Sequence, residues 1–146
     1  MKAIFPIKIQ MTKITVETTI QKPIETVWSC WTQPEHITKW NFASDDWECP
    51  ESSNDLAEDG KFKTKMAAKD GSISFYFEGT YNKIENNKRI DSELSDGRKI
   101  EVQFTETPDG TKVTETFDAE TQNPEEMQKQ GWQAILNNFK KYVEEK

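Results

Sequence analysis

The sequence contains few of the residues that most often bind metals or form disulfides. There is 1 His and there are 2 Cys in 146 residues, and neither Cys30 nor Cys49 has a second soft ligand at a recognised metal-binding spacing. We therefore expect no metal site and no cofactor. A catalytic pair of Cys30 and His36 is disfavoured because a proline separates the segments that carry them. Two cysteines suit a reducing compartment, so a disulfide is the less favoured alternative.

Long hydrophobic runs and an excess of positive charge are also missing. No apolar run reaches the roughly 20 residues that span a bilayer, and the first residues lack a secretory signal pattern. The formal net charge of -7 disfavours nucleic acid and anionic membranes as partners. No phosphate-binding loop, dinucleotide fingerprint or G-x-S-x-G motif occurs. These absences favour a cytoplasmic protein without membrane insertion.

The apolar residues that are present are few but large. Hydrophobic residues make up 34% of the chain and charged residues 31%, yet there are 5 Trp and 8 Phe. This composition indicates one domain whose core is built from a few large aromatic residues, and we assign it to residues 12–146. Residues 1–11 are predicted to be an N-terminal extension, either a segment without fixed structure or the product of a mistaken translation start. Deleting residues 1–10 should change the unfolding free energy by less than about 1 kcal/mol.

The longest predicted helix lies at the C-terminus, over residues 123–145. Asn123 is the expected N-cap, the following proline occupies the first helical position, and Glu126 completes a capping box. An apolar stripe at helical spacing consists of Trp132, Ile135, Leu136, Phe139, Tyr142 and Val143. Lys140 is expected on the opposite, solvent-exposed side. Gly131, which costs about 1 kcal/mol in a helix interior relative to alanine, is expected either to allow a close backbone approach or to leave space beside the stripe.

The remaining elements predict a curved antiparallel sheet. Residues 14–20 alternate as a half-buried strand, and residues 23–40 form two short helices, the second starting at a capping box from Thr32 to Glu35. Residues 41–60 are acidic and irregular, which indicates a solvated loop, a flexible mouth over a pocket, or a short strand near residues 44–49. Five alternating strands then follow, and they are joined by turns at Asp70-Gly71, Asn86-Asn87, Asp96-Gly97 and Pro108-Asp109-Gly110.

These short turns exclude parallel crossovers, because a parallel connection needs a dozen or more residues. The predicted fold class is therefore α+β, with a curved antiparallel sheet wrapped around the long C-terminal helix and two short helices after the first strand. This arrangement covers the apolar face of the sheet with the apolar stripe of the helix.

Four local motifs resemble one known family. They are WTQPEHITKW at residues 31–40, FEGTY at 77–81, GTKVTETF at 110–117 and GWQAILNNF at 131–139. In this order they resemble bacterial homologues of the activator of the ninety-kilodalton heat-shock-protein ATPase, within the START-like (SRPBCC, helix-grip) superfamily. The resemblance implies the helix-grip fold, which hosts lipid carriers, cyclases, hydrolases and co-chaperone domains. Eukaryotic activators carry an additional N-terminal chaperone-binding domain, whereas about a dozen residues precede the first strand here.

Three functions are compatible with these features. The first is a small cytosolic protein that binds an apolar or amphipathic, lipophilic small molecule between the sheet and the C-terminal helix. The second is a chaperone-associated or stress-response module that binds proteins. The third is a cyclase- or hydrolase-type enzyme that uses Glu115 as acid or base. A single carboxylate without a partner is thin support for catalysis, so we do not expect an enzyme and assign no catalytic residue.

The candidate ligand-binding residues are Trp31, Trp40, Trp47, Phe62, Met66, Phe75, Phe77, Tyr81, Phe104, Glu115, Phe117, Gln128 and Trp132. By strand alternation Glu115 shares the inward face with Val113 and Phe117, so it is either a polar anchor in the cavity or a strand residue that reaches solvent at a strand end or a bulge. Arg98 is its candidate partner, or else only a turn residue. Without a cation nearby, burial should raise the pKa of Glu115.

Overall fold

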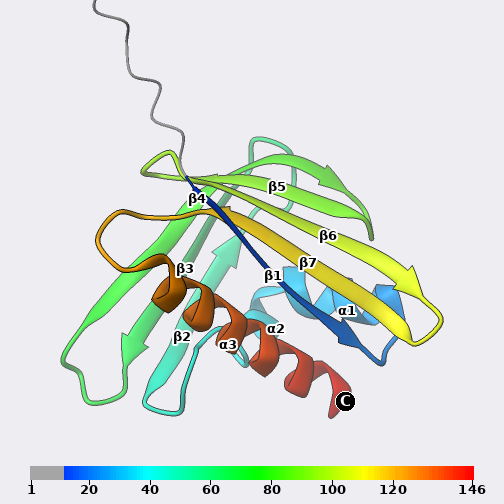
Figure 1. Ribbon diagram of the computed structural model, residues 1–146, viewed down its shortest axis with the longest axis horizontal. Coiled ribbons are helices and arrows are strands. Elements are labelled where there is room, and N and C mark those ends of the chain that lie inside the picture. The colour runs from blue at the N-terminus through cyan, green and yellow to red at the C-terminus, as the bar shows by residue number, and fades with distance from the viewer. Residues whose placement is uncertain (1–11) are drawn as a thin grey trace, which may run out of the picture.

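A strongly curved seven-stranded sheet dominates the computed structural model, which describes residues 12–146 (Figure 1). The strands are β1 (Lys13–Ile20), β2 (Trp47–Asn54), β3 (Lys61–Ala68), β4 (Ser74–Glu85), β5 (Arg89–Leu94), β6 (Lys99–Thr107) and β7 (Gly110–Asp118). All pairs are antiparallel, in the order β1-β7-β6-β5-β4-β3-β2. The predicted meander, with the first strand at its end, is confirmed. The N-terminal extension predicted for residues 1–11 lies outside the described residues.

The turns occur where the sequence predicts them. Gly71 and Gly97 have φ angles of 79° and 93°, and Asn87 has a φ angle of 62°. Glycine and asparagine tolerate this left-handed region better than other residues. Each hairpin therefore closes at a residue that adopts the required backbone conformation at low cost.

The acidic stretch from 41 to 60 contains an edge strand that we did not predict at this length. Strand β2 pairs with β3, and the register shifts between Glu48 and Glu51. Pro50 lies inside this irregularity, where its missing N–H does not interrupt a regular ladder. The proline and the absence of alternation hid the strand. The prediction of a mostly loop-like segment was therefore wrong for residues 47–54.

Two short helices follow β1, as predicted: α1 (Ile24–Thr32) and α2 (Pro34–Ile37). Helix α2 ends earlier than expected. The hydroxyl of Thr32 donates to the Trp28 carbonyl at 2.8 Å, and α2 has no side-chain cap. The predicted capping box is therefore absent, because the preceding helix already uses the threonine hydroxyl.

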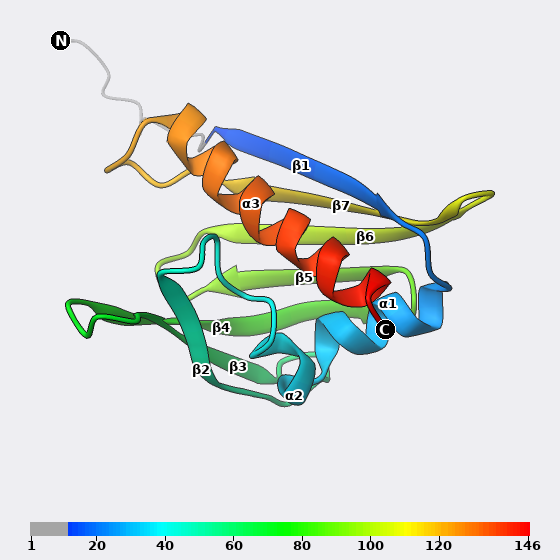
Figure 2. The same cartoon turned by 90° about the horizontal axis from the view of Figure 1, so that it is seen from below.

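The long helix α3 (Glu125–Glu144) crosses the concave face of the sheet beside β1 (Figure 2). Pro124 is its N-cap, so the predicted cap at Asn123 was wrong. The Gln128 amide instead holds the preceding loop. It donates to the carbonyls of Glu120 and Asn123 at 3.0 and 2.8 Å, and its oxygen accepts from the Glu120 N–H at 2.9 Å.

The apolar stripe of α3 packs into the core as predicted. Leu136, Phe139 and Val143 are at most 1% exposed. Phe139 contacts Trp40 with a ring-centroid distance of 4.6 Å, and Trp31 contacts Phe139 at 5.0 Å. Helix α1 and the loop after α2 therefore meet the C-terminal half of α3 through an aromatic cluster that closes one end of the fold.

The other side of α3 is less solvated than expected. Lys140 donates from Nζ to the Thr19 carbonyl of β1 and also pairs with Glu144 at 2.7 Å. Gln133 donates to the Glu17 carbonyl of the same strand at 3.2 Å. The prediction that Lys140 lies on the solvent-exposed face was therefore wrong. Gln133 and Lys140 cover the free edge of β1, and we call these two bonds the β1 edge contacts.

Candidate functional site

A cavity of about 460 Å³ lies between the concave face of the sheet and α3. Strands β3 to β7 contribute its floor and one wall, and the opposite wall comes from Asn123, just before α3, and from α3 itself as far as Leu136. Residues around α2, including Ile37 and Ala43, close a third side. This volume falls in the range of roughly 300–1,000 Å³ that is typical of small-molecule sites.

Ten of the thirteen residues predicted from the sequence line this cavity. They are Trp31, Trp40, Phe62, Met66, Phe75, Phe77, Tyr81, Glu115, Gln128 and Trp132. They come from five different elements and from the loop after α2. The fold therefore brings together residues that are as much as 101 positions apart in the sequence, namely Trp31 and Trp132.

The other three predicted residues lie elsewhere. Phe117 is 1% exposed and stacks on Trp132, with ring centroids 3.8 Å apart, so it supports the wall from behind. Phe104 packs edge-on against Trp28 at 5.1 Å. Trp47 contacts Phe75 at 6.0 Å from the adjacent edge strand. Phe117 and Phe104 therefore do not line the cavity, because side chains of α3 and α1 cover them. Trp47 also lies outside the lining.

Sequence reasoning missed several residues of the floor. Ile90, Ser92, Ile100 and Val102 face the cavity from β5 and β6. The alternation that assigned Glu115 to the interior also applies to these four residues, so the signal was available. Gly131 also lines the cavity, and a Cβ built there meets nothing within 4 Å. The expected space beside the glycine is present.

Glu115 lies in the cavity wall and is 8% exposed. Its carboxyl group forms no hydrogen bond with another described residue, yet no fully enclosed polar side-chain atom of residues 12–146 lacks a partner. The carboxyl oxygens must therefore touch the open space of the cavity. Burial raises the pKa of Glu115 to about 8, because desolvation penalises the charged form.

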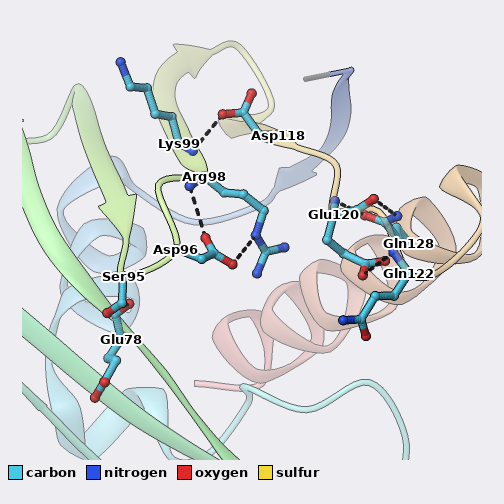
Figure 3. Close-up of polar contacts among 9 residues, drawn as sticks. All are labelled: Glu78, Ser95, Asp96, Arg98, Lys99, Asp118, Glu120, Gln122 and Gln128. Atoms are coloured by element: carbon cyan, nitrogen blue, oxygen red, sulfur yellow. Dashed lines mark hydrogen bonds and ion pairs between the residues drawn. The ribbon is translucent and has the colours of Figure 1, made fainter. Parts of the chain in front are cut away.

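Arg98 is not the partner of this carboxyl group. It reaches the cavity at the end where α3 begins, and its Nε pairs with Asp96 Oδ2 at 2.9 Å (Figure 3). In the same region, Glu120 accepts from the backbone N–H groups of Gln122 and Asn123 at 2.9 and 2.8 Å. These bonds order the loop at the cavity rim. Within residues 12–146, Glu115 has no salt-bridge partner, because Arg98 pairs with Asp96 instead.

The histidine links two helices, and the two cysteines are buried. His36 Nδ1 lies 2.7 Å from the Tyr142 hydroxyl and joins α2 to α3. Cys30 and Cys49 are both free and buried, and burial raises the pKa of each thiol. Within residues 12–146, no group of three or more His, Cys, Asp or Glu is placed to hold a metal ion.

The sequence of residues 21–144 matches the family described as Activator of Hsp90 ATPase homolog 1-like protein. The chain belongs to this family. The fold is the helix-grip fold of the START-like superfamily, with the long helix held by the curved sheet. No curated protein gives a significant match. The part of the chain that the structure describes has no helix long and apolar enough to cross a membrane.

Similar solved structures support the family assignment or the fold. The solution structure of the AHSA1-like protein from Aeromonas hydrophila is 48% identical, with a TM-score of 0.86, over 92% of this chain and 93% of that chain. A solution structure from Cytophaga hutchinsonii is 51% identical, with a TM-score of 0.80, over 91% and 92%. A crystal structure from Chromobacterium violaceum, 19% identical with a TM-score of 0.80 over 91% and 98%, shares the fold.

Proposed function

We propose that this AHSA1-like protein binds an apolar or amphipathic small molecule in the cavity between the sheet and α3. The observation that carries the proposal is the composition of the cavity walls. Arg98 and Glu115 are the charged residues among those described as lining it, while most of the others are aromatic or aliphatic. Small-molecule sites typically combine apolar walls with a few polar groups that orient the ligand.

The lining residues divide into two roles. Trp31, Trp40, Phe77 and Trp132 are the principal apolar contacts in this proposal, because they offer large rigid surfaces on opposite sides of the cavity. Glu115 is the polar anchor, since its oxygens touch the cavity space. Phe62, Met66, Phe75 and Tyr81 complete the apolar wall, and Gln128 holds the loop before α3.

Gly131 offers a direct test, since it lines the cavity and a Cβ at this position meets no atom within 4 Å. Gly131→Leu should weaken the binding of a lipophilic fluorescent probe at least about ten-fold by occupying the space that the probe needs. Gly131→Ala is the matched control, and it should bind the probe nearly as wild type does. Equal affinity of wild type and Gly131→Leu would rule out this cavity as the binding site. Native mass spectrometry of the purified protein should show a retained small molecule.

Protein binding is a second candidate, favoured by a separate observation. Ile73 and Phe75, two residues apart and on the same side of the chain, are 55% and 46% exposed at the projecting end of the β3–β4 hairpin (Figure 2). Large apolar side chains gathered on a surface are typical of protein contacts. If this surface serves the activity in the family description, wild type should raise the ATPase rate of Hsp90, and Ile73→Ser should reduce the stimulation. An unchanged ATPase rate with wild type would exclude this candidate.

A further inference from the structure

We propose that the inner part of the cavity selects a neutral ligand that carries a hydrogen-bond acceptor, such as the carbonyl oxygen of a ketone, ester or amide. The Glu115 carboxyl group, in its uncharged form, donates the hydrogen bond to this acceptor. This inference rests on the proposed function and specifies the chemical class of the ligand.

Among the residues that the structure describes, those around Glu115 provide no charge that could balance a carboxylate. In the sheet, Glu115 pairs with Val16 of β1 and Val102 of β6. Across the cavity, α3 presents Gly131, Trp132 and Ile135. None of these side chains is charged or titratable. Among the described residues that line the cavity, Arg98 is the remaining charged one.

Arg98 is too distant to act on Glu115 directly. Val102 is the neighbour of Glu115 on β6, and Arg98 precedes Val102 by four residues. At about 3.3 Å per residue, the two positions are separated by roughly 13 Å along the strand. The guanidinium group also pairs with Asp96. The desolvated carboxyl group of Glu115 therefore keeps its proton at neutral pH, and its pKa is raised to about 8.

A protonated carboxyl group that faces apolar space has one unsatisfied O–H donor. A ligand carbonyl oxygen satisfies this donor, and neither group then has to carry charge. A ligand carboxylate would bring an unpaired charge into the same space, which is costly. A ligand amine would require Glu115 to ionise and would bury an ion pair, whose desolvation opposes the gain. The neutral acceptor is therefore the favoured ligand chemistry.

Two matched probes test this selection: a propionyl-(dimethylamino)naphthalene, which carries a ketone, and its parent (dimethylamino)naphthalene, which does not. At about pH 6, wild type should bind the ketone about five-fold more tightly than the parent, the expected effect of one hydrogen bond. At about pH 9.5, where Glu115 is ionised, this preference should disappear. The affinity for the parent should stay constant.

Two variants assign the effect to Glu115. Glu115→Gln should keep the preference for the ketone at both pH values, because the amide donates and does not ionise. Glu115→Leu should bind both probes equally, and near-ultraviolet circular dichroism should check that it is folded. If wild type binds the parent without preferring the ketone, or if the preference grows with pH, the inference is wrong while the proposed function stands. If neither probe binds, the proposed function fails as well.

Discussion

At the scale of single residues, Glu115 should make stability depend on pH. Its pKa is about 8 in the folded protein, against an ordinary value of 4.5. Between these values the folded state holds a proton that the unfolded chain has lost. The unfolding free energy should therefore fall as pH rises above about 4.5, by up to about 1.4 kcal/mol per pH unit, and level off above about pH 8.

Urea denaturation of wild type and Glu115→Gln over this pH range measures the effect, because the difference between the two profiles isolates Glu115. Glu115→Gln should lack this slope and should be the more stable protein above about pH 8. Parallel profiles for the two proteins would show that Glu115 titrates as an ordinary exposed side chain.

Leu136 tests which face of α3 packs against the sheet. Its side chain is 1% exposed beneath the helix, so Leu136→Ala should lower the unfolding free energy by about 2–5 kcal/mol. The exposed Lys141 on the same helix is the control. Lys141→Ala should change the unfolding free energy by less than about 0.5 kcal/mol. Similar losses in both variants are incompatible with the packing described above.

At the scale of elements, the β1 edge contacts should contribute to stability. Lys140→Ala removes the bonds to the Thr19 carbonyl and to Glu144, and should cost about 1 kcal/mol, because a donor to a strand edge is lost. Chemical denaturation alongside Lys141→Ala provides the comparison. A loss no larger than that of Lys141→Ala would mean that water replaces the Lys140 bonds without cost.

The sequence was most informative about elements that have strong local signals. Asn87, Gly71 and Gly97 marked the hairpins, and the alternation around Glu115 assigned its side chain to the interior. Strand β2 was expected only as an alternative, a short strand near residues 44–49, because Pro50 and the irregular register conceal its pairing. The cap of α3 was assigned wrongly because the orienting bonds come from Gln128, inside the helix, rather than from Asn123.

The cavity was harder to predict than the sheet for a physical reason. Alternation tells which face of a strand is apolar, but it does not tell how closely the helix approaches that face. Phe117 and Glu115 share one face of β7, yet Trp132 covers Phe117 while Glu115 stays open to the cavity. Only the position of α3 across the sheet separates core residues from lining residues.

At the scale of the whole molecule, a ligand should stabilise the fold. A molecule that fills the cavity binds the folded state alone, because sheet and helix must both be in place. At a free probe concentration of about 100 times Kd, the unfolding free energy should increase by about 2.7 kcal/mol. Thermal denaturation should show this shift for wild type and a much smaller one for Gly131→Leu. A shift of the same size in both proteins would place the probe outside the cavity.

The sheet order also determines when this protein can fold during its synthesis. Strand β1 leaves the ribosome early, but its partner β7 lies near the other end of the chain, and Lys13 bonds to Asp118 across 105 positions. At about 5–20 residues per second, translation takes roughly 5–20 s to bridge this interval. Throughout that time the apolar face of β1 has neither β7 nor α3 to cover it. The nascent chain therefore needs protection from aggregation until the last helix has emerged.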